Sequence, residues 1–203
     1  MDIVNLTQKQ LGIPEKSGGV LGYGGSHGVR MTEGIGLYRQ ALTAHVQMDL
    51  VGRKNQRSEA AGFLDELLNQ IIPQVESSLP QPPTWRGIAG YSLAGLFALW
   101  SLWQTDAFDR AASASGSLWF PDFVDRASTA PFASSPQAVY LSLGKKEAKT
   151  PNRMMRHVLD DTRAMEKLLG ERGIPTTLEL NPGNHFSQTD LRMARGIHWI
   201  LTH

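Results

Sequence analysis

The chain of 203 residues contains no cysteine. A disulfide framework, a thiolate zinc site and a cysteine nucleophile are therefore excluded for this chain. An excess of one charge is also missing, because 20 basic residues balance 19 acidic ones to a formal net charge of +1. The sequence shows no basic cluster, so we expect neither nucleic acid nor anionic lipid as a primary partner.

Long hydrophobic runs are missing too. The longest apolar run, 93–103, is too short to cross a bilayer, and the start of the sequence lacks the basic and apolar regions of a signal peptide. These features predict a cytoplasmic protein with no membrane partner. The content of 41% hydrophobic and 19% charged residues is ordinary for a globular protein. We predict a single domain over 1–203, in which a divergent segment, 1–57, precedes a core, 58–203.

A glycine-flanked serine is the most informative feature that the sequence does contain. Residues 87–100 (GIAGYSLAGLFALW) predict a short strand, a sharp turn at Ser92 and an apolar helix. Gly90 before the serine, and Ala94 and Gly95 after it, leave no bulky Cβ in the turn. This arrangement is typical of a nucleophile elbow, which presents the serine hydroxyl above the edge of the sheet.

The elbow pattern also has a second interpretation. It departs from strict G-x-S-x-G, because Ala94 occupies the fifth position, and a tight turn before a core helix would give a similar pattern. The strand before Ser92, the helix after it, and the later order of acid and histidine favour the nucleophile. The N–H group of Leu93, at the start of the helix, is a predicted oxyanion donor.

A serine hydroxyl needs a base to take its proton, and His185 is the candidate. It lies in the glycine-containing loop 181–185 after the last predicted strand, where an α/β-hydrolase presents its histidine. His157 and His198 fall within predicted helices, and His203 is the last residue. We therefore predict that His185 is the base.

The acid that orients the base should follow the serine in the sequence and lie on a loop after a strand. Glu147, just after the predicted strand 137–143, fits best. Two alternatives stay open: Glu147 is a surface carboxylate beside Lys145 and Lys146, or a Ser–His pair works without an acid.

The remaining histidines of the N-terminal half give no metal site. His27 and His45 have no carboxylate or second histidine at ligand spacing, so we interpret them as loop or surface residues. We predict no metal and no cofactor.

Strands and helices alternate along the chain, which predicts an α/β fold with a mostly parallel sheet and helices on both faces. Functional sites in such folds gather at the carboxyl ends of the strands. Pro73 is expected to kink the first helix near its end, and a glycine, Gly170, to end the fourth. The predicted strands are 20–23, 84–91, 110–116, 137–143 and 176–180, and the predicted helices are 58–75, the elbow helix from 93, 121–128, 152–170 and 189–201.

Aromatic side chains near the serine have two possible interpretations. Trp119 and Phe120, with Tyr91, are candidates for the wall of a substrate pocket. Alternatively, the aromatic residues of this segment, Phe123 included, form the core contact of the short helix that follows.

From residue 58 to the C-terminus the chain resembles the esterase family that includes bacterial siderophore (enterobactin and salmochelin) esterases, within the α/β-hydrolase fold. The resemblance implies hydrolysis of a small-molecule ester through Ser92 and His185, with Glu147 where many relatives carry the acid and some siderophore esterases lack one. It rests on the residues 62–76, GYSLAGLFA at 90–98, SASGSLW at 113–119 and GNH at 183–185.

The resemblance stops before residue 58. Relatives carry a longer N-terminal part with several strands and a loop that supplies the second oxyanion donor, and here 20–23 looks like the last of those strands. We therefore expect a shortened sheet that lacks the usual first strands. The backbone of Tyr23 and Gly24 is then the candidate second donor.

Two further expectations follow from a shortened sheet. A bare sheet edge invites pairing with a second copy, so we favour a homodimer; the alternative is that the glycine-rich residues 15–35 cover the edge. An incomplete oxyanion hole would weaken catalysis, and the alternative function is then a weak or inactive hydrolase-fold protein that binds a ligand or partner.

Overall fold

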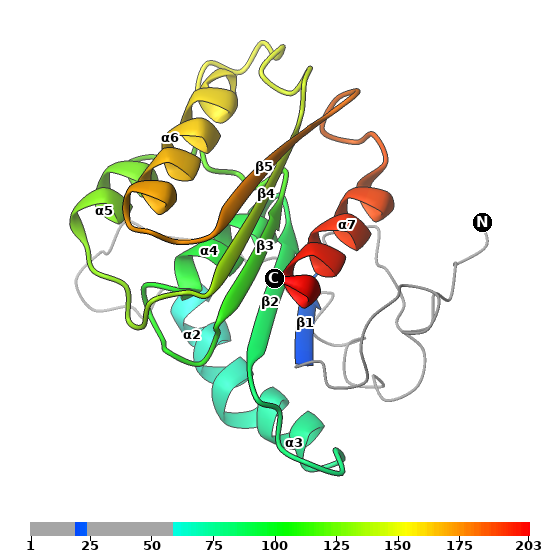
Figure 1. Ribbon diagram of the computed structural model, residues 1–203. Helices are drawn as coiled ribbons and strands as arrows, with labels where there is room; N and C mark the ends of the chain where they lie inside the picture. Colours follow the sequence, from blue (N-terminus) through cyan, green and yellow to red (C-terminus); the bar gives the residue numbers. More distant parts are fainter. Residues whose placement is uncertain (1–18, 24–58) are drawn as a thin grey trace.

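The computed structural model describes residues 19–23 and 59–203, and their centre is a five-stranded parallel sheet (Figure 1). Its strands lie side by side in chain order, each paired with the next. Because every connection runs back to start a parallel neighbour, all five carboxyl ends meet at one edge. The strands are β1 (Gly19–Tyr23), β2 (Arg86–Tyr91), β3 (Arg110–Ala114), β4 (Ala138–Gly144) and β5 (Thr176–Asn181).

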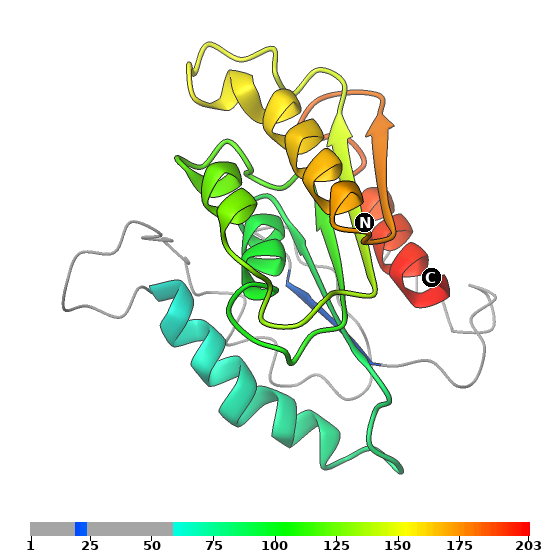
Figure 2. The same cartoon turned by 60° about the vertical axis from the view of Figure 1, so that its left-hand side comes forward.

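Helices cover both faces of this sheet (Figures 1 and 2). On one face α4 (Leu93–Ser101) packs on β2 and β3, and α6 (Val158–Glu171) packs on β4 and β5. The short helix α5 (Phe123–Thr129) lies against α6 on the same side. On the other face α7 (Thr189–Thr202) crosses β2, β3 and β4. The predicted fold class, an α/β sheet with helices on both faces, is confirmed.

Small residues in β3 allow the helices to approach closely. Ala112 lies under α7, and a Cβ added to Gly196 of α7 would lie 3.2 Å from the Ala112 Cβ and 2.9 Å from the ring of Tyr140. A larger residue at Gly196 would push the helix off the sheet. The run of alanine and serine in this strand thus positions α7, which begins just after the loop that carries His185.

The first predicted helix is divided into three segments: α2 (Glu59–Glu66), a π-helical turn η1 (Leu67–Ile71) and α3 (Ile72–Glu76). The N–H group of Ile72 bonds the carbonyl of Leu67, five residues back. In a regular helix the ring of Pro73 would meet the carbonyl of residue 69, so a wider turn directly before the proline relieves that clash. The predicted disturbance at Pro73 is confirmed, and its form is a π turn.

Helix α6 differs from its predicted bounds at both ends. A 3-10 turn, η2 (Met155–His157), precedes it, and the helix continues past Gly170 to Glu171. The predicted cap at Gly170 is wrong, because Gly173, at φ +75°, adopts the left-handed conformation that ends the helix.

Several predictions concern residues outside the described ranges. His27, His45 and Gly24 belong to 24–58, so their predicted roles stay predictions. The same holds for the missing first strands and for the homodimer through the β1 edge. Within the part of the chain that the structure describes, no helix is long and apolar enough to cross a membrane.

Candidate active site

Ser92 sits at the sharp turn between β2 and α4. Its backbone has φ 60° and ψ −120°, a conformation that residues with a side chain rarely adopt. Hydrogen bonds hold the turn: the N–H of Ser92 donates to the carbonyl of Ala114 at 3.0 Å, and its carbonyl accepts from Ser117 N at 3.0 Å. Strain of this kind persists only where the surroundings impose it, and it is common at functional sites.

Two glycines make the turn possible. A Cβ on Gly90 would overlap the carbonyl of Ala94, and a Cβ on Gly95 would lie 3.0 Å from the Cα of Gly116. Ala94 itself is buried without such a conflict. The departure from strict G-x-S-x-G therefore has a structural reason, because the close approach falls on Gly95 and leaves room for the methyl group of Ala94.

The structure brings the three predicted catalytic side chains together. His185 Nε2 lies 3.1 Å from Ser92 Oγ, and His185 Nδ1 lies 2.8 Å from Glu147 Oε2. Ser92 follows β2, Glu147 lies in the turn after β4, and His185 lies in the loop after β5, so the carboxyl ends of three strands supply the group. The histidine side chain is 24% exposed, whereas that of Glu147 is 4% exposed.

The carboxylate of Glu147 is fully engaged. Its Oε1 accepts hydrogen bonds from Ser115 Oγ at 2.6 Å, from the N–H of Gly144 at 2.6 Å and from Arg192 Nη2 at 3.0 Å, which leaves Oε2 for the histidine. Burial alone would raise the pKa of Glu147, but these hydrogen bonds, with that from His185 and the charge of Arg192, outweigh burial and lower it. Glu147 is therefore a buried carboxylate, and the alternative of a surface residue is wrong.

The loop that carries His185 is also fixed. Gly183, at φ +92°, accepts a hydrogen bond from Lys146 N at 2.9 Å, which links the loop to the turn of the acid. The hydroxyl of Tyr91 donates to the carbonyl of His185 at 2.6 Å. The backbones around Glu147 and His185 are thus tied to each other and to β2.

The oxyanion donors are partly described. Leu93 is the first residue of α4 and follows Ser92, so its N–H has no acceptor within the helix and stays a candidate donor. Tyr23 ends β1 opposite Gly90, two residues before the serine, which brings the end of β1 to the same edge of the sheet. Gly24 lies outside the described residues. The second donor therefore stays a prediction.

The three candidate pocket residues have different surroundings. Tyr91 is buried, and its ring centroid lies 5.5 Å from that of His185, so it supports the histidine rather than forming an open wall. Trp119 is half-buried. Phe120 packs against the larger hydrophobic core, in which Phe123 is buried, so these two residues follow the core-packing alternative.

Two residues of the site were not predicted from the sequence. Arg192, in the first turn of α7, and Ser115, at φ 47° after β3, both contact Glu147. Ser115 belongs to the SASGS segment, whose match to the esterase family was a usable signal. Arg192 had none, because an arginine in an amphipathic helix ordinarily faces water.

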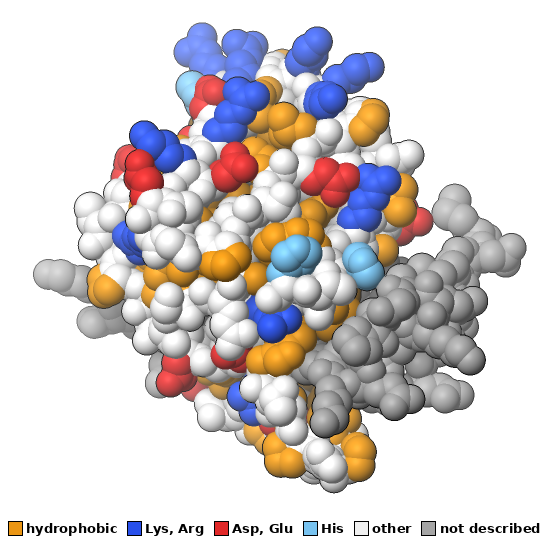
Figure 3. Space-filling model, in the orientation of Figure 1, with side chains coloured by type: hydrophobic (Ala, Val, Ile, Leu, Met, Phe, Trp, Pro, Cys, Tyr) orange, Lys and Arg blue, Asp and Glu red, His pale blue; other side chains and the backbone are white. Residues whose placement is uncertain are grey.

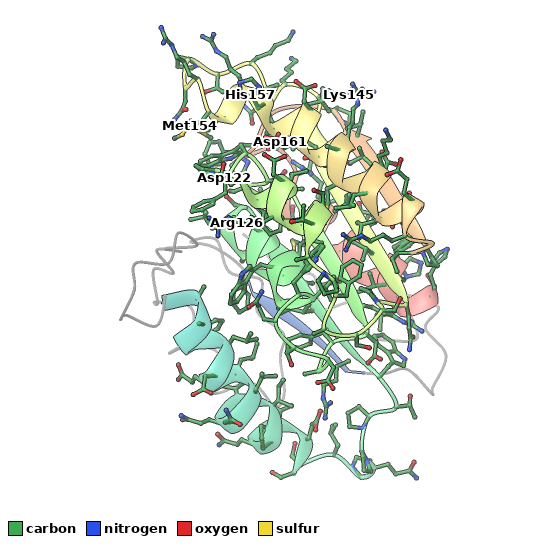
Figure 4. All side chains as sticks on the ribbon, turned by 90° about the vertical axis from the view of Figure 1, so that its left-hand side faces the viewer. Asp122, Arg126, Lys145, Met154, His157 and Asp161 are labelled. Carbon is green, nitrogen blue, oxygen red and sulfur yellow. The ribbon has the colours of Figure 1, made fainter. Side chains whose placement is uncertain are left out.

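Other histidines and carboxylates lie elsewhere. Figure 4 shows His157, just before α6, and Asp161 in its first turn, on the side where Asp122, just before α5, and Arg126 of α5 lie. Burial raises the pKa of Asp161; the charge of His157 opposes this rise, and the charges of Asp160 and Asp125 add to it. Among residues 19–23 and 59–203, no group of three or more potential ligands could hold a metal ion.

The surface corrects one expectation about charge. Lys and Arg side chains gather at one end of the molecule, over the turn after β4 and the start of α6 (Figure 3). The expectation that the chain has no basic cluster is wrong for this segment. Other residues separate most of these cations in the sequence, and the fold brings them together. The exposed cations of this segment are Lys145, Lys146, Lys149, Arg153 and Arg156.

A parallel sheet with helices on both faces, and a serine turn at the end of one strand facing a histidine loop after a later one, define an α/β-hydrolase fold. The chain belongs to the esterase family described as "Putative esterase", which matches residues 43–189. This confirms the resemblance noted in the sequence.

Individual relatives are more distant. The chain is 27% identical over 146 residues to the uncharacterized protein YbbA of Bacillus subtilis (strain 168), a match that covers 68% of this chain and 58% of YbbA. Similar solved structures include the enterobactin esterase FES of Shigella flexneri, with a TM-score of 0.57 and 18% identity, covering 73% of this chain and 42% of FES. The siderophore hydrolase EstB of Aspergillus nidulans has a TM-score of 0.58 and 20% identity, covering 74% of this chain and 60% of EstB.

At these identities the structural likeness shows the fold alone. The chain spans 58% of the length of YbbA and between 42% and 60% of the two solved structures. What those proteins act on is therefore a basis for proposals about this chain.

Proposed function

We propose that the chain is a serine hydrolase that cleaves carboxylic esters, with Ser92 as nucleophile, His185 as base and Glu147 as the acid that orients the base. The observation that carries the proposal is the pair of contacts at 3.1 Å and 2.8 Å that joins the three side chains in the order the chemistry requires.

Each group has a definite role in the reaction. Ser92 Oγ attacks the ester carbonyl while His185 Nε2 takes the hydroxyl proton, which forms a tetrahedral intermediate with a negative oxygen. The intermediate collapses to an acyl-serine, and the histidine gives its proton to the leaving alcohol. Water then attacks the acyl-serine by the same route in reverse, which releases the carboxylic acid and restores the serine.

Glu147 keeps His185 in the productive tautomer. Its carboxylate accepts the Nδ1 hydrogen, which leaves Nε2 free to receive the serine proton. The low pKa of Glu147 keeps the acid ionised at neutral pH, and the charge stabilises the imidazolium that forms during the attack.

The negative oxygen of the intermediate needs hydrogen-bond donors. The N–H of Leu93 is one donor, at the positive end of α4. We assign the second to the backbone at Tyr23 and Gly24, because β1 ends beside Gly90. Loss of one such donor lowers turnover by about 100- to 1,000-fold.

For the substrate we propose a small carboxylic ester, with a siderophore-like ester as the first candidate. The similar structures are named as enterobactin and siderophore hydrolases. Apolar side chains flank the serine on the surface, since Leu93 is 41% and Phe186 81% exposed. Phe186 also packs edge-on against His185, with ring centroids 5.1 Å apart, so the acyl or alcohol group would meet an aromatic surface.

The test compares ester hydrolysis by two serine variants. Ser92→Ala should lower the hydrolysis of p-nitrophenyl acetate and of enterobactin to the background rate. Ser113→Ala is the matched control, because its buried hydroxyl has no hydrogen-bond partner among the described residues, and it should hydrolyse both esters at the wild-type rate. A wild-type protein that hydrolyses neither ester, nor any of a panel of acyl chain lengths, would favour the alternative of a non-catalytic binding protein.

A further inference from the structure

Arg192 is the most deeply buried charged side chain of the described residues, with an exposure of 0%. It projects from the first turn of α7 toward the carboxyl ends of β2, β3 and β4. Its Nη2 donates to Glu147 Oε1 at 3.0 Å and also to Ser115 Oγ. Its Nη1 donates to the hydroxyl of Tyr91 at 2.9 Å.

These contacts connect the guanidinium to both the acid and the base. Through Nη2 it holds the oxygen of Glu147 that does not face the histidine. Through Nη1 it orients the Tyr91 hydroxyl, which donates to the carbonyl of His185. One rigid planar group therefore contacts the carboxylate directly and the backbone of the histidine loop through the Tyr91 hydroxyl.

Stability alone is a weak reason for this arrangement. A buried ion pair must offset the loss of water around both charges, and well-packed hydrophobic residues of similar volume often serve equally well. The Nε of Arg192 has no hydrogen-bond partner among the residues that the structure describes, so its burial is not even fully compensated. A planar donor that reaches two groups at fixed distances is, in contrast, what alignment of the acid with the base requires.

A neighbouring arginine supplies the comparison. Arg195 lies one turn further along α7 and pairs with Glu179 at 2.6 Å, but its side chain is 47% exposed. Its contacts, Glu179 and Asn181, belong to β5 and touch neither the acid nor the base. The two arginines share a helix and a charge and differ in whether they contact the site.

We propose that Arg192 is a positioning residue that sets the alignment of Glu147 and His185 through a two-armed contact, one arm on the acid and one, by way of Tyr91, on the base. This inference rests on the proposed function. Arg192 acts through the other residues and is not expected to touch the substrate.

The experiment measures kcat and KM for p-nitrophenyl acetate in a double-mutant cycle. Arg192→Met keeps much of the side-chain volume and removes both arms, and it should lower kcat by about 100-fold with little change in KM. In a Glu147→Gln background the same substitution should lower kcat by no more than about 10-fold, because only the arm to the base is then left to lose. Arg195→Met should leave both constants unchanged.

The pH profile gives a second readout that a purely structural role would not move. The charged groups that face Glu147 are Arg192 and, when protonated, His185, with the hydroxyl of Tyr91 nearby. Removal of the guanidinium leaves the carboxylate easier to protonate, so the acidic limb of kcat/KM should move to higher pH in Arg192→Met. Arg195→Met should keep the wild-type limb.

Each outcome decides the inference. An Arg192→Met protein with wild-type kcat, or an equal 100-fold loss in the wild-type and Glu147→Gln backgrounds, would overturn it. If Arg192→Met does not fold, Tyr91→Phe removes the arm to the base alone and should lower kcat about 3- to 10-fold, and an unchanged kcat would contradict the two-armed contact. A wild-type protein without any hydrolysis that depends on Ser92 contradicts the proposed function instead, so the two failures are distinguishable.

Discussion

The two faces of the sheet are packed with different kinds of side chains. The face under α4, α5 and α6 holds a core of aliphatic and aromatic side chains from many elements, among them Leu99, Leu141 and Leu169. The face under α7 has a smaller cluster of alanines, two tyrosines and a few aliphatic residues. Both buried charged residues of the described ranges, Glu147 and Arg192, lie where α7 meets the carboxyl ends of the strands.

This difference assigns most of the stability to one face of the sheet and the proposed chemistry to the other. Each large side chain fully buried on the first face contributes about 1.5–3 kcal/mol of transfer free energy, so that face supplies most of the stability. A polar network on the second face contributes less net free energy, since its hydrogen bonds replace bonds to water. It fixes the positions of an acid and a base, which the apolar face cannot do. Substitutions on the two faces should therefore separate into losses of stability and losses of turnover.

The largest effect is expected from the acid. Glu147→Gln keeps the size of the side chain but offers His185 Nδ1 no charged acceptor, so kcat for an ester substrate should fall by about 10³- to 10⁴-fold. Steady-state kinetics at pH 7 measure this loss, and covalent labelling of Ser92 gives the concentration of active enzyme. Turnover within a factor of three of wild type would mean that a Ser–His pair suffices.

The elbow, the histidine loop and the turn of the acid could be predicted from the sequence because each has a local signal. Small residues surround Ser92 in the sequence, and Glu147 and His185 lie in the short loops that follow β4 and β5. The contacts of Arg192 join residues 45 and 101 positions apart, and no local pattern reports such a pairing. Strand and helix types were predictable for the same local reason. The end of α6 at Glu171 depended instead on the left-handed conformation of a single residue, Gly173.

The second-largest effect falls on stability. Leu169, on α6, is completely buried in the larger core, so Leu169→Ala should lower the free energy of unfolding by about 2–5 kcal/mol. Its neighbour Leu168 is only partly buried, and Leu168→Ala is the matched control with a smaller loss. Urea unfolding measures both. The kcat of the folded Leu169→Ala protein should match wild type, and a large loss of kcat would contradict the division between the faces.

The pH dependence of stability tests the charge of Glu147. Its pKa is lowered from 4.5 in the folded chain, so the folded state binds fewer protons than the unfolded state in this range. The stabilisation that the ionised Glu147 carboxylate gives the folded state is fully present above pH 4.5. It is lost as the pH falls through the pKa of Glu147 in the folded chain. Denaturant unfolding between pH 6 and 3 should show this loss in wild type, and Glu147→Gln should show a shallower slope.

A second carboxyl requires a control in this experiment. The hydrogen bond from Arg86 lowers the pKa of Glu76 as well, in a partly exposed pair. Glu76→Gln should therefore change the slope less than Glu147→Gln does, because solvent screens a partly exposed pair more than a buried one. Equal slopes in the two variants would contradict a special role for the buried carboxylate.

The smallest effect concerns Ser115, whose φ of 47° is unfavourable for any residue with a Cβ. Ser115→Ala and Ser115→Gly both remove the hydrogen bond to Glu147, but only glycine relieves the backbone. The glycine variant should be more stable than the alanine variant by about 1 kcal/mol, while both lower kcat by a similar factor. Thermal unfolding and kinetics of the pair measure this, and an alanine variant as stable as the glycine variant would remove the argument from strain.

The central claim is that Ser92 is a nucleophile activated by His185, and a fluorophosphonate probe tests it most directly. Intact-protein mass spectrometry should find one phosphonyl group per chain, and peptide mapping should locate it on Ser92. The adduct should be absent in Ser92→Ala and form at least 100-fold more slowly in His185→Ala, because the serine then has no base to take its proton. Wild-type protein that stays unlabelled while a control esterase is labelled, or an adduct on another residue, would contradict the account.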